Sequence, residues 1–281
     1  MVPARSTLVL LGALALALAG CGEDRWEAFG DDSAIVFGVK QRVDPATKVP
    51  GVTAGYELLR LGGRGFAVEA DRVAGGTCAL EDLSKRRGTG RIESGRAVFS
   101  GGALPAGGLT ILANAEGVVT APGASWASGD DLAFQVEGFA MPPLGGFRFR
   151  APSPDLVVTK PEVPAASARL AVPVTEDLAL GWTPPDAAAP ATGDAVLVAL
   201  TLGEGEGFEL RCFYERRQGS AVVPRTWLRA LREAAGSTAE ASGTLTLSSQ
   251  RQVTLAGRGS WIVYVVASAV ARELPFVLPP P

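Results

Sequence analysis

Carboxylates are the side chains with which this chain could do chemistry, because its 281 residues include no histidine. Without imidazole there can be no Ser-His-Asp triad, no Cys-His pair and no histidine-bearing zinc site. Two acids close together could still serve as the pair of a glycosidase or as calcium ligands. The acidic residues that stand together in the sequence are Asp31 and Asp32, Glu81 and Asp82, Asp130 and Asp131, and Glu204 and Glu206.

Each of these pairs lies in or near a predicted loop, and none belongs to an Asp-x-Asp-x-Asp-Gly calcium loop. We interpret them as solvated turn residues and expect no metal or other cofactor. The chain also lacks a Gly-x-Ser-x-Gly elbow, a Ser-x-x-Lys motif and a Gly-x-x-x-x-Gly-Lys phosphate loop. Its net charge of −3 provides no basic field, so we expect no nucleic-acid partner.

Tryptophan could instead mark a carbohydrate surface. Trp126 stands among turn residues, and we expect it to be the exposed tryptophan of the folded domains. Trp126, Asp130 and Asp131 are therefore the candidate ligand contacts, although a single ring is a weak platform. We expect the tryptophans that fall in strand or helix patterns to pack in the core: Trp182, Trp227 and Trp261.

The N-terminal segment has the layout of an export signal. A basic n-region with Arg5 precedes an apolar run over residues 8–18, which at about eleven residues is too short to span a membrane. Leu18-Ala19-Gly20-Cys21 resembles the bacterial lipobox. This resemblance implies cleavage before Cys21 and acylation of its thiol, and two or more acyl chains anchor a protein stably. An ordinary signal peptide with a coincidental cysteine is the alternative.

Between residues 34 and 150, and again between 177 and 278, short apolar or alternating runs are separated by Gly, Pro and Asp. This spacing is typical of antiparallel all-β domains. We predict two Ig-like β-sandwich domains in tandem. The predicted divisions are a signal peptide (1–20), a tether (21–33), an N-terminal β domain (34–160), a Pro-rich linker (161–168) and a C-terminal β-sandwich domain (169–281).

One short helix is predicted in the second domain. Val223, Trp227, Leu228 and Leu231 have helical spacing, and Pro224 suits a first helical turn.

The two cysteines besides Cys21 leave two interpretations open. Export permits a disulfide between Cys78 and Cys212. Against it, Cys212 shares a strand face with Leu210 and Tyr214, where a buried thiol would act as a small apolar side chain. Cys78 is also predicted to lie in the other domain, so we favour two buried thiols over the bond.

The C-terminal half resembles uncharacterised β-rich lipoproteins that are abundant in myxobacteria. The resemblance is carried by Asp177-Leu-Ala-Leu-Gly-Trp182, by Gly193-Asp-Ala-Val-Leu-Val, and by Cys212 followed by Gly219-Ser-Ala-Val-Val-Pro224. Upstream, Gly108-Leu-Thr-Ile-Leu112 and Ala151-Pro-Ser-Pro-Asp-Leu-Val-Val-Thr159 are similar to the N-terminal half of the same group. The resemblance implies a two-part Ig-like arrangement and no particular activity.

Two functional hypotheses follow. The first is a cell-envelope binding or structural module without catalytic activity, anchored by lipid on Cys21, most simply in the outer membrane, with another envelope protein or a glycan as partner. The second is an envelope hydrolase that uses paired carboxylates and so needs no histidine.

Overall fold

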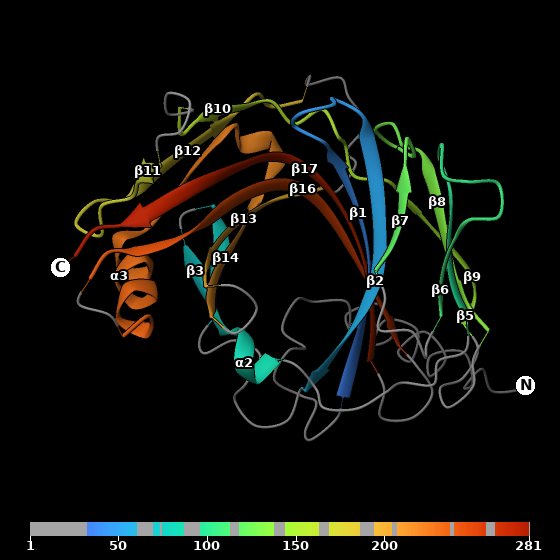
Figure 1. Ribbon diagram of the computed structural model, residues 1–281, viewed down its shortest axis with the longest axis horizontal. Coiled ribbons are helices and arrows are strands. Elements are labelled where there is room, and N and C mark those ends of the chain that lie inside the picture. The colour runs from blue at the N-terminus through green and yellow to red at the C-terminus, as the bar shows by residue number, and fades with distance from the viewer. Residues whose placement is uncertain are drawn as a thin grey trace, which may run out of the picture.

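The structure is a computed structural model (Figure 1), and it describes residues 33–60, 70–73, 75–86, 96–112, 118–137, 144–162, 169–185, 194–203, 207–236, 239–256 and 262–280. The signal peptide, Cys21 and nearly all of the tether lie outside these residues, as do the acidic pairs at 31–32 and 204–206, Trp261 and most of the predicted linker.

The described residues form strands throughout, with one helix longer than a single turn, α3. The elements are β1 (Ser33–Val43), β2 (Pro50–Arg60), β3 (Ala70–Val73), β4 (Gly76–Asp82), α2 (Leu83–Arg86), β5 (Arg96–Gly101), β6 (Leu109–Leu112), β7 (Val119–Pro122), β8 (Asp131–Val136), β9 (Leu144–Arg150), β10 (Val158–Lys160), β11 (Leu170–Ala171), β12 (Leu178–Trp182), β13 (Ala195–Leu202), β14 (Phe208–Glu215), the 3-10 turn η2 (Arg216–Gln218), β15 (Ser220–Val223), α3 (Arg225–Ala234), β16 (Ala241–Ala256) and β17 (Ile262–Leu278).

Strands β16 and β17 form the long antiparallel ribbon of a ten-stranded sheet. The order of this sheet is β3-β4-β14-β13-β16-β17-β1-β2-β7, with β11 also paired to β17. The pairing of the ribbon shifts between Leu247 and Ser248, where a bulge bends the strands. Figure 1 shows the result as an arch, with β13 and β14 on one side and β1 and β2 on the other.

The first sandwich lies at one end of the arch. Residues 262–269 of β17 pair in parallel with β1, which pairs in turn with β2 and then β7. A second sheet of order β6-β5-β8-β9 covers the outer face of these strands. Alternate residues such as Phe37, Phe99, Phe134 and Val265 meet between the two sheets with no exposed surface.

The second sandwich lies at the other end. Residues 243–250 of β16 pair with β13, and β14 and β4 follow. The small sheet β10-β12-β15 and helix α3 cover this part of the arch. Leu200 and Leu247 from the large sheet meet Leu180 from the small sheet and Leu228 from the helix, all of them buried.

The all-β prediction and the helix are confirmed. Helix α3 runs from Arg225 to Ala234, directly after Pro224, and Gly236 follows it with φ +63°. Trp227 packs against the second core, as its spacing predicted. Glycine at that position allows the left-handed backbone that ends a helix.

The tandem arrangement of two sandwich domains is not confirmed. Val263, Val265 and Ala267 come from the C-terminal half but belong to the first core, while Cys78 and Leu80 come from the N-terminal half but belong to the second. The two cores therefore do not follow the predicted boundary at 161–168. Local patterns identify strands, but they do not say which distant strands will pair.

Candidate functional site

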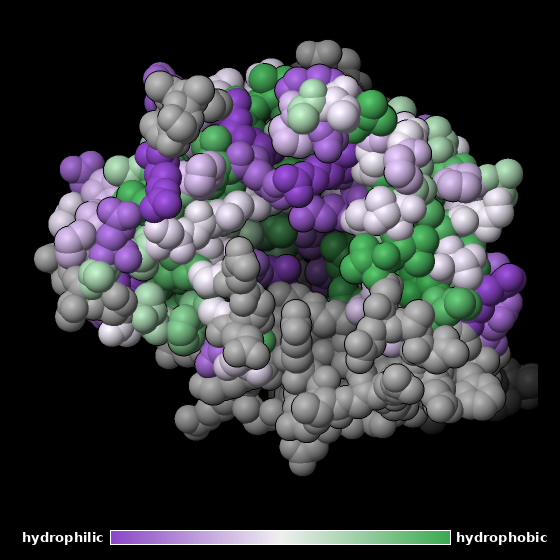
Figure 2. Space-filling view, viewed as in Figure 1, coloured by the Kyte–Doolittle hydropathy of each residue, from purple (hydrophilic) through white to green (hydrophobic). Residues whose placement is uncertain are grey.

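The strongest candidate site is the inner face of the arch, the face of the ten-stranded sheet that points away from both cores. Strand register places residues of this face in rows across the sheet. One row contains Gln250, Ser268, Lys40 and Thr53. Figure 2 shows a hollow in the middle of the molecule, with hydrophilic residues above it and hydrophobic residues to its right. The row of Gln250 is thus rich in hydrogen-bonding groups, with Gln250 buried, whereas the row of Phe213, Leu197, Ser248 and Val270 is largely apolar.

Three charged side chains form the first ion-pair group of the inner face. The Arg42 guanidinium lies 2.5 Å from Glu273, measured from Nη2 to Oε2, and Lys40 Nζ lies 3.9 Å from Oε1 of the same carboxylate. Lys40 and Arg42 come from β1, and Glu273 comes from β17. The two cations are about half exposed, at 45% and 54%, whereas Glu273 is 22% exposed. Lys40 and Arg42 are therefore the more accessible charges of this group.

A second group joins two glutamates from neighbouring strands. Glu81 of β4 lies directly opposite Glu209 of β14. Arg211 contacts both, with Nε 2.6 Å from Glu209 Oε1 and Nη1 3.7 Å from Glu81 Oε1. The Thr201 hydroxyl donates a hydrogen bond of 2.9 Å to Glu209. Like charges directly opposite on a sheet repel, and the guanidinium between them offsets that repulsion.

These groups leave no strong field of one sign on the inner face, because each carboxylate has a cationic neighbour. Within the described ranges, no three acidic or cysteine side chains come together as metal ligands. The charges of the two groups are therefore largely neutralised locally.

Trp126 is not the exposed tryptophan that its turn-rich sequence predicted. It is 3% exposed, its backbone N–H donates to the Gln41 side chain at 2.8 Å, and its Nε1 donates to the Pro152 carbonyl at 2.9 Å. The surrounding turn is folded over the first core, so the ring is buried despite its polar neighbours. The prediction was wrong, since turn residues report backbone conformation and not exposure.

Asp130 and Asp131 have local partners in the structure. The Asp130 carboxylate accepts a hydrogen bond of 2.8 Å from the Ala127 N–H, which closes the turn after Trp126. Asp131 lies 3.3 Å from Arg150, and both side chains are more than half exposed. With Trp126 buried, the three residues do not form a shared surface for a ligand.

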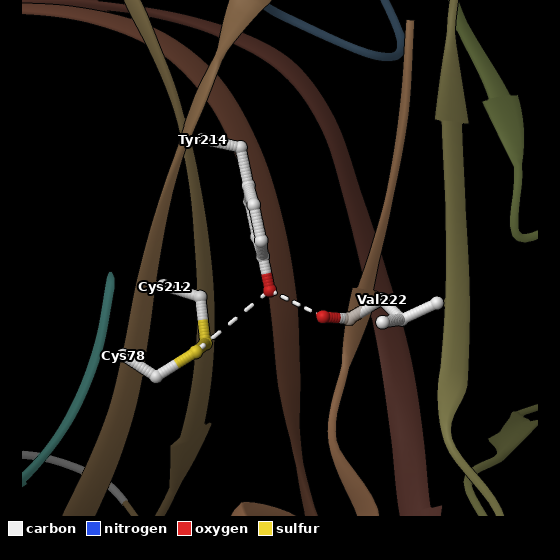
Figure 3. Close-up of a disulfide and its surroundings, with 4 residues drawn as sticks. All are labelled: Cys78, Cys212, Tyr214 and Val222. Atoms are coloured by element: carbon white, nitrogen blue, oxygen red, sulfur yellow. Dashed lines mark hydrogen bonds between the residues drawn. A yellow bond between two sulfur atoms is a disulfide. The ribbon is translucent and has the colours of Figure 1, made fainter. Parts of the chain in front are cut away.

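The cysteines form the disulfide that the sequence reading had disfavoured (Figure 3). Cys78 and Cys212 face each other across β4 and β14, with Cα atoms 4.1 Å apart, and the bond joins positions 134 residues apart. Both cysteines are fully buried. The expectation of two free thiols was wrong because β4 crosses into the second sandwich, which no local pattern indicated.

Tyr214 packs beside the disulfide and ties the large sheet to the small one. Its hydroxyl lies 3.7 Å from Cys78 Sγ and 2.7 Å from the Val222 carbonyl of β15. A bonded sulfur carries no proton, so the hydroxyl proton goes to the carbonyl, the stronger acceptor. Burial raises the pKa of Tyr214 well above that of a free tyrosine. The group is therefore a neutral structural link.

A buried polar junction connects the two sandwiches. Asp194, at the start of β13, has a fully buried side chain whose Oδ2 accepts from the Ser153 N–H at 2.9 Å and lies 3.8 Å from Arg216 Nη1. The Arg216 carbonyl in turn accepts a 2.6 Å hydrogen bond from Trp182 Nε1. Ser153 follows Pro152, the acceptor for Trp126. The junction thus links the tryptophans of the two cores.

Sequence reasoning missed the inner-face groups and this junction. Glu209 and Arg211 alternate with the buried residues of their strand, so the sequence pattern indicates that they share its other face. Their meeting with Glu81 depends on the pairing of β4 with β14, and no local signal indicated it.

Comparisons with known proteins add little. No family model and no curated protein matches the chain. Among solved structures, the chain has a weak match to the crystal structure of the chicken CNTN1 FN1-FN3 domains, with 9% identity, 71% of this chain and 64% of that chain covered, and a TM-score of 0.19. The chain thus spans less than two thirds of that structure. So low a score leaves the fold to be described from its own sheet pairing.

The described part of the chain contains no helix that is long and apolar enough to cross a membrane.

Proposed function

We propose that this protein is a lipid-anchored binding or structural module of the bacterial cell envelope, without catalytic activity. The observation that carries the proposal is Leu18-Ala19-Gly20-Cys21 behind an apolar run, the arrangement of a lipobox. Acyl chains on Cys21 would hold the two sandwiches at the membrane. The outer membrane is the proposed location, and another envelope protein or a glycan is the proposed partner.

The inner face supports a binding role. Its charged groups are paired by Arg42 with Glu273 and by Arg211 with two glutamates, and one of its rows carries Gln250, Ser268 and Thr53 beside Lys40. Such a face suits a neutral polar chain, either an extended peptide or a glycan, better than a strongly charged partner.

Lipidation is tested by labelling cells with an alkyne analogue of palmitate. We expect the wild-type chain to incorporate the label and Cys21→Ser to lose it, with the exposed, conservative change Thr244→Ser as the control that should keep it. Undiminished labelling of Cys21→Ser would show that the anchor is assigned wrongly.

Binding at the inner face is tested separately by photo-crosslinking in intact envelopes. A photoreactive residue at Thr244 lies on the inner face, and one at Arg148 lies on the outside of the first sandwich; both positions are exposed. We expect a discrete adduct from position 244 only. Equal adducts from both positions would exclude the inner face as the specific surface.

A hydrolase remains the second proposal because Glu81 and Glu209 are directly opposite each other on the inner face. Retaining glycosidases use a pair of carboxylates as acid/base and nucleophile. Arg211 contacts both, so the guanidinium stands where substrate or water would be needed. This contact is the reason for preferring the non-catalytic proposal. Hydrolysis of purified peptidoglycan that is lost in Glu209→Gln would reverse the preference.

A further inference from the structure

One edge of the ribbon has no pairing partner among the described strands. The pairing of β13 with β16 ends at Gln250 of β16, which lies opposite Ala195 of β13. Residues 251–256 of β16 continue beyond β13 and pair on one side only, with β17. In the described part of the chain no other strand and no side chain bonds to their outer backbone groups. The same strand is thus interior in one sandwich and an edge in the other.

Three other sheet edges, those of β7, β9 and β10, carry devices that discourage strand addition. β7 ends in Pro122, which lacks an N–H. β9 presents the exposed cations Arg148 and Arg150. At β10, Arg272 donates hydrogen bonds to the carbonyls of Val158 and Pro161, at 2.7 and 2.9 Å. These edges are protected by proline, by charge or by an occupied acceptor.

The open edge of β16 has none of these protections along its centre. Gln252 and Thr254 are exposed on the inner face, and Val253 packs partly on the first core. Arg251 is the one charge in residues 251–256 and stands at the end nearest β13. An edge with high strand propensity and a free backbone is a template for another strand.

We propose that this edge pairs with the same edge of a second copy, antiparallel and about a two-fold axis centred on Val253. Such an interface is isologous, since each copy offers the same surface. The sequence is complementary to itself in this register. Val253 meets its own copy, Gln252 stands opposite Thr254, and Arg251 stands opposite the uncharged position 255. No like charges meet, and each Gln–Thr pair adds a side-chain hydrogen bond.

The consequence is a sheet that continues through the dimer. The inner faces of the two copies would join along Gln252 and Thr254, so the polar surface described above would extend across both molecules. This proposal does not depend on lipidation of Cys21 or on any ligand.

Cysteine crosslinking of the full chain, purified from membranes in detergent, tests the contact. In the proposed register the two Val253 Cα atoms would be about 5 Å apart, within reach of a disulfide. We expect Val253→Cys to form an intermolecular dimer on mild oxidation. Thr246→Cys is the control, because Thr246 lies on the same strand where β13 and β17 flank it on both sides. Equal crosslinking by both variants, or by neither, would overturn the proposal.

A charge swap tests the register. Gln252→Lys with Thr254→Lys places like charges opposite each other twice, so the measured mass should fall two-fold to that of a monomer. Gln252→Lys with Thr254→Glu places opposite charges there, and the dimer should return. Both positions are exposed, so circular dichroism should show the same fold in each variant. A wild-type protein that sediments as a monomer would refute the self-pairing. A wild-type edge that pairs with a strand of another protein instead would refute it as well.

Discussion

The two sandwiches share one ribbon but hold their strands together differently. In the first, three phenylalanines cluster between the sheets with tilted rings: Phe37 and Phe134 have ring centroids 4.9 Å apart, and Phe99 and Phe134 4.7 Å apart. In the second, most core side chains are aliphatic, and a disulfide, a tyrosine hydroxyl and a helix link its strands. Buried hydrogen bonds from Trp126 support the packing of the first core, whereas the second core adds a covalent crosslink.

The difference between the two cores follows from the sequence separation of the strands that pair in each. The strands of the first core come from residues 33–60, 96–150 and 262–269, and most are joined to a sequence neighbour by a short turn. The second core must bring β4 to β14 across more than a hundred residues. Closing so long a loop costs chain entropy, and a crosslink removes that cost from the folding step.

Removing the disulfide should have the largest effect on this comparison. For the 134-residue separation of Cys78 and Cys212, the double variant with alanine should lose about 5 kcal/mol of unfolding free energy. Urea unfolding followed by circular dichroism measures the loss. The wild type assayed in reductant is the matched control and should lose a similar amount. A loss below about 1 kcal/mol would mean that packing alone holds β4 in place.

Truncating the phenylalanine cluster of the first core should lower the unfolding free energy almost as much as removing the disulfide. Phe134 is fully buried and touches both other rings, so Phe134→Ala should lower the unfolding free energy by about 4 kcal/mol. Leu200→Ala is the counterpart in the second core and should cost about 3 kcal/mol. If the ribbon couples the sandwiches, each variant should still unfold in a single transition. Two separate transitions in calorimetry would show that the cores are independent.

Breaking the junction tests the coupling itself. Asp194→Ala leaves Arg216 with 10% of its side chain exposed and without its acidic partner, and it leaves the Ser153 N–H unpaired. The loss should be about 3 kcal/mol. Hydrogen exchange should rise on both sides of the junction, at residues 151–153 and at η2. Faster exchange at η2 alone would show that the junction belongs only to the second sandwich.

The smallest predicted effect concerns Tyr214. Tyr214→Phe leaves the Val222 carbonyl without its hydrogen bond and should cost about 1 kcal/mol at neutral pH.

The same variant should also change the alkaline behaviour. The pKa of Tyr214 is raised by burial, so the folded protein keeps the phenol neutral while an unfolded chain ionises above its ordinary value of 10.0. Stability from this group is therefore fully present below about pH 10 and is lost as pH rises towards the folded-state pKa. Tyr214→Phe should have a shallower fall in unfolding free energy from about pH 9 to pH 11. An unchanged slope would assign the effect to other groups, such as Tyr264, whose pKa burial also raises.

Much of the fold could be predicted because its signals are local. Alternating residues such as Leu210, Cys212 and Tyr214 identify one face of a strand, and all three are buried. Pro224 and Gly236 bracket the helix for reasons of backbone geometry alone. The arrangement of the strands into two cores could not be predicted from local signals. A prediction of tandem domains assumes that neighbours in sequence are neighbours in space.

By itself, the sequence determined the all-β class, the helix, the burial of Trp182 and the motif at Cys21 on which the proposed anchor depends. Only the tertiary structure decided that Cys78 and Cys212 are bonded, that Trp126 is buried, and that Glu81 shares a guanidinium with Glu209. The physical reason is the distance along the chain over which each kind of signal acts. Side-chain periodicity and turn chemistry act over a few residues, whereas strand pairing is selected by the apolar surface that the whole chain can bury at once.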